Sequence, residues 1–189
     1  MSRGLRALVA CVAILAPVGT AQARTAAQAN PQKDFRIAHD VVAAVNNYDQ
    51  FTVFDDVSVG VEDGVVTLNG KVTMPYKRNE LEKRAAAVDG VREISNRISV
   101  LPVSMFDDEL RNRIARSIYG NSNFWDYAIM RNPPIHIVVD RGHVTLTGVV
   151  RSDVDRMLAR SLATQFSAFS VTSKLRTDAE MNSARENSD

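Results

Sequence analysis

Histidine side chains are the first place to look for chemistry in this chain. The 189-residue sequence holds three of them, His39, His136 and His143. His136 lies in a β-branched run and His143 follows a turn seven residues later, so the two rings are expected to approach each other as cross-strand neighbours. Two imidazoles alone do not complete a zinc coordination shell, which has three or four protein ligands. We therefore predict no metal site and interpret the pair as partly solvated edge residues.

Two acidic runs are the next candidates, for divalent-cation binding or for paired-carboxylate catalysis. They are Asp55-Asp56 and Asp107-Asp108-Glu109. Adjacent side chains point in different directions on a strand or a helix, so neither run presents two carboxylates to one point. The second run also suits a helix N-terminus, where negative charge is stabilised. The sequence shows no nucleophile elbow, phosphate-binding glycine loop or metalloprotease motif. We predict no catalytic residue, no enzyme activity and no cofactor.

The most suggestive segment for binding is Phe124–Arg131, which contains the only tryptophan of the chain. Tryptophan and tyrosine beside arginine suit a membrane interface, where the ring lies in an apolar layer and its polar tip is hydrated. The same surface could bind a protein. The alternative is that Phe124 and Trp125 fill a core or a seam, since large aromatic side chains are usually buried. The candidate lipid- or partner-binding residues are Trp125, Tyr127, Met130 and Arg131.

Basic side chains gather on two expected helices: Lys77, Arg78, Lys83, Arg84, Arg111, Arg113 and Arg116. Near a membrane such groups attract anionic headgroups by about 1 kcal/mol each. Acidic residues such as Glu80 and Glu82 alternate with them, so a solvated helix face is the simpler interpretation. The net charge of +1 argues against a sequence-independent hold on nucleic acid. Nothing in the pattern indicates a small-molecule substrate.

An internal repeat must position these residues. The segments 64–70 (GVVTLNG) and 142–148 (GHVTLTG) lie 78 positions apart, and each follows a β-branched run and an acidic turn. This pattern predicts two β-hairpins, in which Gly64 and Gly142 supply the positive φ of a three-residue loop. The glycines that form the fold are then Gly64, Gly70, Gly90, Gly142 and Gly148.

Helical periodicity surrounds each hairpin. Apolar residues recur at helical spacing from Ile37 to Tyr48, with Asp34 placed to cap the first turn, and a second helix starts at Pro75. In the second copy Phe124 aligns with Phe51, which favours a core position for Phe124. When a helix connects two strands of one sheet, the crossover is expected to be right-handed and the two strands parallel. We predict an α+β fold of two α-β-β-α-β modules, each a three-stranded mixed sheet packed against two helices.

The expected boundaries follow from this plan. The first module spans 34–102 and the second 103–176, with a flexible leader at 24–33 and a disordered tail at 177–189. A unit of about 70 residues is marginally stable alone, so we expect the two modules to pack together.

Residues 1–23 have the layout of a secretory signal peptide. Two arginines precede a continuous apolar run, Ala7–Ala16, and Ala21-Gln22-Ala23 is a small-x-small cleavage site. The run is too short for a membrane-spanning helix. We expect secretion with cleavage of this segment after Ala23. The alternative is a lipobox ending at Cys11, which would leave a lipidated cysteine. Because Cys11 is the single cysteine, an internal disulfide is ruled out.

The plan resembles the BON domain, a small module of bacterial envelope proteins, here in tandem. The second copy has Ala168-Phe169 where the first has Gly90-Val91, so we expect it to have diverged in role. The residues that carry the likeness are Val57–Val59, Gly64–Val72, Ala85, Gly90-Val91 and Asn96–Ile98, then Gly142–Val150 and Val171–Leu175.

The resemblance implies a non-enzymatic periplasmic module that contacts membrane phospholipid or envelope proteins in envelope maintenance or stress. A holdase-type chaperone or protein-docking module is the alternative. The family motif carries no catalytic residues, so none is transferred to this chain.

Overall fold

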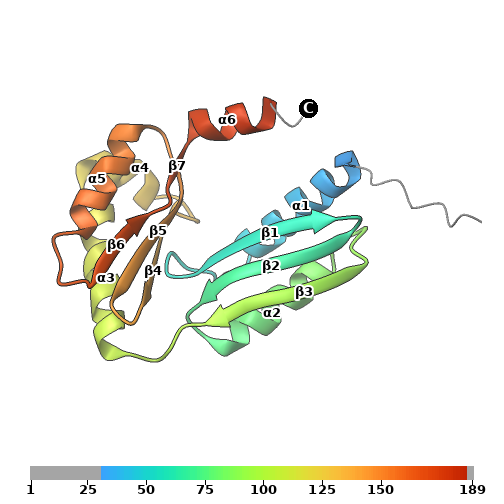
Figure 1. Cartoon of the computed structure of the whole chain (residues 1–189), viewed down its shortest axis with the longest axis horizontal. Helices are drawn as coiled ribbons and strands as arrows, with labels where there is room; N and C mark the ends of the chain where they lie inside the picture. The colour runs from blue at the N-terminus through green and yellow to red at the C-terminus, as the bar shows by residue number, and fades with distance from the viewer. Residues whose placement is uncertain (1–30, 187–189) are drawn as a thin grey trace, which may run out of the picture.

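Two α+β modules of the same plan make up the part of the chain that the computed structural model describes, residues 31–186 (Figure 1). The first module contains α1 (Pro31–Asn46), β1 (Asp56–Glu62), β2 (Val65–Val72), α2 (Pro75–Ala86) and β3 (Glu93–Val100). The second contains α3 (Met105–Tyr119), η1 (Ser122–Phe124), α4 (Trp125–Ala128), β4 (Ile135–Asp140), β5 (His143–Val150), α5 (Asp153–Ala163), β6 (Ser170–Ser173) and β7 (Arg176–Thr177), followed by α6 (Asp178–Glu186).

Each sheet is mixed, as the sequence predicts. β1 and β2 pair antiparallel and β2 and β3 parallel, and β4, β5 and β6 repeat this order. The third strand of the second sheet is interrupted, because β7 resumes the parallel pairing with β5 after Lys174-Leu175. In each module two helices cover one face of the sheet, as Figure 1 shows. The α+β class and the repeated plan are confirmed.

The two cores occupy matching positions. Leu68 on β2 faces Val59 across the hairpin, and Leu146 on β5 faces Ile137 in the same way. Both leucines are fully buried. Alternate residues of each central strand therefore point to the helices, and the residues between them point to the outer face of the sheet.

The hairpin loops are shorter than we predicted. Glu62 pairs with Val65, so Asp63-Gly64 forms the whole turn, and Arg141-Gly142 does the same in the second module. In each turn φ is 51° at the first residue and 75° or 78° at the glycine. Positive φ at both central residues is type I′ geometry, whose twist matches that of the flanking strands. The third residue that we assigned to each loop belongs to the first strand.

Asp34 holds a hairpin turn and does not cap its own helix, which begins earlier, at Pro31. Its two carboxylate oxygens accept hydrogen bonds from the backbone N–H groups of Asp63-Gly64 at 2.8 and 2.9 Å. Asp107 repeats the arrangement with Arg141-Gly142, at 2.8 Å for both bonds. In each module, therefore, one aspartate fastens the hairpin turn to the start of the first helix.

The C-terminal segment is helical where we predicted a disordered tail. Thr177 and Glu180 form a capping box: the Thr177 N–H donates to Glu180 Oε2 at 2.8 Å, and the Glu180 N–H donates to Thr177 Oγ1 at 3.2 Å. Arg156 of α5 also bonds Glu180, at 2.8 Å. The prediction of disorder is thus wrong for α6. It rested on polar composition and did not take account of the capping box.

At the other end, residues 31–33 belong to α1 and not to a flexible leader. The remainder of that leader, the expected signal segment with Cys11 and residues 187–189 lie outside the described residues. Among the helices described, none is long and apolar enough to cross a membrane.

Candidate functional site

The two hairpin histidines do not meet. In the β4–β5 register the partner of His136 is Thr147, whereas His143 lies next to the turn, so the rings are at opposite ends of the hairpin. The His136 ring packs against Phe51 at 5.6 Å between centroids, and the His143 ring against Phe169 at 5.8 Å. The predicted approach is wrong, because the two-residue turn places Asp140, and not His136, opposite His143. Within residues 31–186 no group of three or more potential metal ligands occurs.

Asp55 is the centre of a buried hydrogen-bond network. Its carboxylate accepts from Lys77 Nζ at 2.6 Å. It also accepts from the backbone N–H and hydroxyl of Thr52, and from those of Thr73, at 2.8 to 2.9 Å. Both charged side chains are buried, so each compensates the other in a site that excludes water. Lys77, which we expected on a solvated face, is structural.

The second acidic run is structural as well. Ser104 caps α3 by accepting a hydrogen bond from the Asp107 N–H at 3.2 Å. Asp108 pairs with Arg111 at 3.1 Å, and Arg111 donates from Nη2 to the carbonyl of Val139 at 3.2 Å. Since Arg111 is buried, it does not belong to a solvated basic face either.

The candidate segment is divided between core and surface. Phe124 is fully buried, as its alignment with Phe51 predicted, and Tyr127 is buried beside it. The Tyr127 hydroxyl accepts a hydrogen bond from the Arg151 N–H at 2.9 Å, so this side chain supports the core. Trp125 is 67% exposed and is not a core residue.

The remaining candidates lie at the surface around α4. Met130 is exposed, and so is Ile129, which we had not singled out. Arg131 lies at the seam between the modules, where its Nη2 pairs with Asp49 Oδ1 at 2.5 Å. We call Trp125, Ile129 and Met130 the α4 surface.

A second apolar surface lies at the opposite end of α3. Its members are Met105 (89% exposed), Phe106 (50%) and Phe169 (77%), and we call them the tip surface. Phe106 and Ser167 line one small hollow, which places the start of α3 beside the loop that contains Phe169. In Figure 1 the start of α3 and the β4–β5 turn lie at the bottom of the second module and α4 at its top. The 15 residues of α3 make a helix about 22 Å long between these two ends of the module.

The sequence signal for the tip surface is the departure at Phe169 from the first copy. Its counterpart Val91 is half-buried, whereas the Phe169 ring is exposed and covers the second hairpin turn. A Cβ atom on Gly142 would lie 2.6 Å from Phe169 Cδ2. The Phe169 N–H also donates to the Gly142 carbonyl at 2.8 Å. Periodicity alone could not reveal this surface, because it does not distinguish an exposed apolar residue from a core residue.

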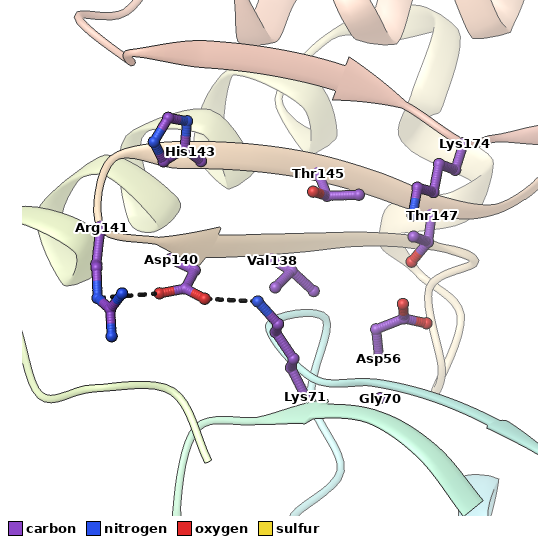
Figure 2. A pocket seen from close by; sticks show the side chains of 10 residues that line it. All are labelled: Asp56, Gly70, Lys71, Val138, Asp140, Arg141, His143, Thr145, Thr147 and Lys174. Carbon is purple, nitrogen blue, oxygen red and sulfur yellow. Dashed lines mark hydrogen bonds and ion pairs between the residues drawn. The ribbon is translucent and has the colours of Figure 1, made fainter. Parts of the chain in front are cut away.

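A cleft of about 650 Å³ separates the modules (Figure 2). The outer face of β4 and β5 forms one wall, and the adjacent ends of β1 and β2 form the other. The Nζ of Lys71 bonds Asp140 Oδ2 across the cleft at 2.5 Å. This hydrogen bond, together with the lysine charge, lowers the pKa of Asp140 below its ordinary value. The lining residues are Asp56, Gly70, Lys71, Val138, Asp140, Arg141, His143, Thr145, Thr147 and Lys174.

The loop 47–55 fastens the first module to the second. The carbonyl of Val53 accepts a hydrogen bond from the Ile137 N–H, on the edge of β4 that faces away from β5, at 2.6 Å. Phe54 packs against the core of the second module. The Asp55 network holds this loop in place. A buried network of the first module therefore fixes the loop that bonds the β4 edge of the second module.

Comparison with known proteins decides the family. The BON domain model matches the chain twice, over residues 33–102 and 107–178. The chain belongs to the BON-domain family. Each match covers one module of this tandem BON protein. BON domains are a non-catalytic binding family associated with phospholipid and membrane binding.

Two solved structures of CdsD, a structural protein of the type III secretion system of Chlamydia trachomatis, are similar to the tandem BON protein at 12% identity. One covers 80% of this chain and 97% of its own, with a TM-score of 0.28. The other, the CdsD C-terminal domain, covers 74% and 96%, with a TM-score of 0.27. No curated protein matches the sequence.

Proposed function

We propose that this tandem BON protein binds anionic phospholipid surfaces through the tip surface. The observation that carries the proposal is the exposure of Met105, Phe106 and Phe169 at one end of one module. Large apolar side chains that gather on the surface of a soluble domain mark an interaction site. The family association with phospholipid supports a membrane as the partner.

The tip surface has the energetics that insertion needs. A phenylalanine that moves about 100 Å² of apolar surface from water into the lipid interface gains roughly 2–3 kcal/mol. The ordering cost is small, because Asp107 already fixes the turn and Phe169 is bonded to Gly142. Arg141 on the same turn is exposed and can meet anionic headgroups.

The proposal includes a periplasmic location. Its support is the signal layout of residues 1–23. Lipidation at Cys11 remains the alternative route to the same membrane. The N-terminal residue of protein purified from cells distinguishes them: Arg24 supports cleavage and soluble export, and a modified Cys11 supports the lipoprotein.

Vesicle flotation tests the membrane function. Protein beginning at Arg24 should float with vesicles that contain phosphatidylglycerol, and F106S/F169S should lose most of this binding. W125S is the matched control, since it removes an equally exposed aromatic residue from the α4 surface and should still float. The proposal is wrong if wild-type protein does not float, or if W125S alone abolishes flotation.

A protein-docking or holdase role is the second candidate function. It is favoured by the α4 surface, where Trp125 and Ile129 are exposed. W125S should then weaken suppression of client aggregation, and F169S should leave it unchanged. Equal suppression by wild type and W125S would remove the α4 surface from this role.

A further inference from the structure

We propose that the mouth of the inter-module cleft binds the phosphate group of an anionic lipid while the tip surface contacts its apolar region. The groups that bind it are Arg141 and His143 at the mouth and Lys174 farther along the cleft. This inference rests on the proposed membrane function and assigns a headgroup subsite to it.

The tip surface and the cleft share one turn. Arg141 and His143 flank Gly142 and both line the cleft. The Phe169 ring covers Gly142 on the tip side and contacts the His143 ring at 5.8 Å. A lipid whose chains touch Phe169 therefore has its headgroup next to the cleft mouth, without any rearrangement of the turn.

The charges of the cleft leave cations available. Lys71 and Asp140 are bonded to each other, which leaves Arg141, Lys174 and Asp56 among the charged lining residues. Arg141 is 83% exposed and its Nε stands 4.0 Å from Asp140. Lys174 is also exposed, and across residues 31–186 its Nζ has no hydrogen-bond or ion-pair partner. Lys71, Arg141 and Lys174 together exceed Asp56 and Asp140 by one positive charge, the complement of a phosphodiester.

The β5 wall carries two hydroxyl groups along the cleft. Thr145 and Thr147 line the cleft on the face of β5 that turns away from the core (Figure 2). Thr147 Oγ1 is enclosed and lacks a hydrogen-bond partner within the described part of the chain. Thr147 pairs with His136, at the end of the hairpin away from Arg141, so Thr145, which lies nearer the turn, is the hydroxyl of the proposed subsite.

The first module lacks this site at the matching positions. Asp63 stands where the second module has Arg141, and Val65 where it has His143. The backbone at the turn has φ of 51° in both modules, a left-handed conformation that aspartate tolerates better than arginine. Arg141 therefore occupies a position whose backbone conformation favours an aspartate, the residue that the first module has there. Unfavourable local geometry of this kind is typical of binding sites.

The test uses the full mature chain and vesicles of phosphatidylcholine with and without phosphatidylglycerol. R141D installs the residue of the first module, which suits the turn, and K174Q removes the second free cation. We expect K174Q to weaken binding to the anionic vesicles about fivefold and R141D/K174Q by well over tenfold, with binding to neutral vesicles unchanged. R160Q is the charge-matched control for K174Q, because Arg160 is an exposed cation on α5 that does not line the cleft. Thermal melting checks that the variants fold.

The outcomes separate the inference from the membrane function. Absence of wild-type binding to either vesicle overturns both. Wild-type binding that R141D/K174Q leaves unchanged, or that R160Q weakens equally, overturns the cleft assignment alone. Soluble glycerol phosphate and inorganic phosphate, titrated against the His143 NMR signals, identify the source of the phosphate. Saturable shifts with these anions and no vesicle effect would show a soluble ligand and contradict the lipid headgroup.

Discussion

Asp107 Oδ1 accepts a hydrogen bond from the backbone N–H of Gly142 at 2.8 Å, across 35 positions of sequence. Asp34 makes the same bond to Gly64 at 2.9 Å in the first module. This bond brings the first turn of α3 to the hairpin turn. It holds the helix turn that contains Phe106 at the hairpin turn that Phe169 covers.

Asp107→Ala should therefore weaken both the fold and membrane binding. The change leaves two backbone N–H groups of the β4–β5 turn without acceptors, at a cost of about 2–4 kcal/mol in the free energy of unfolding. Urea denaturation measures this loss. Glu109→Ala is the control, since Glu109 and its partner Arg113 are both exposed and the loss should be less than about 1 kcal/mol. Equal losses in the two variants would contradict the role given to Asp107.

Gly148 should not tolerate a side chain. Its φ is 112°, and a Cβ atom would lie 1.8 Å from the Pro134 carbonyl oxygen. Gly148→Ala should destabilise the protein by several kcal/mol, about 3 or more, because the backbone must move. Gly60→Ala is the matched control, since it lies in a strand with nothing within 4 Å of the added atom. Comparable unfolding midpoints for the two variants would show that the close approach at Gly148 is not required.

The Lys71–Asp140 bond predicts how stability depends on pH. Lys71 lowers the pKa of Asp140 from its ordinary value of 3.8, so the folded protein binds the carboxyl proton less tightly than the unfolded chain. This contribution is complete above about pH 4–5 and is lost as pH falls through the lowered pKa. The difference in unfolding free energy between wild type and Lys71→Met should thus be constant near neutral pH and shrink below pH 4. It should be small throughout, because both side chains are partly exposed. A difference that grows toward acid pH would contradict this sign.

Much of the fold follows from local patterns. The repeated GVVTLNG and GHVTLTG segments predict the hairpins, and the helical periodicity around them predicts the helices that cover each sheet. Phe124 was assigned to the core because Phe51 occupies the equivalent position. These predictions succeed because strand alternation and helical spacing are properties of short segments.

The site depended on contacts that no short segment contains. Asp107 was expected to act on its own helix, yet its partners lie on a turn far along the chain. Lys77 and Arg111 lie in charged helical segments that are typical of a solvated face. In the structure Lys77 bonds Asp55 and Arg111 bonds a strand carbonyl, and both side chains are buried. Phe169 is visible in the sequence as a departure from the repeat, but only the structure shows that its exposed ring covers the β4–β5 turn.

The most direct measurement is the fluorescence of a single tryptophan on vesicles that contain brominated phosphatidylglycerol. The native chain has one tryptophan, Trp125 on the α4 surface, and W125F/F169W moves it to the tip surface. Membrane contact through the tip predicts a blue shift and quenching for W125F/F169W, with little change for Trp125. A strong response of Trp125 and none in W125F/F169W would contradict the assignment of the tip as the membrane-binding surface.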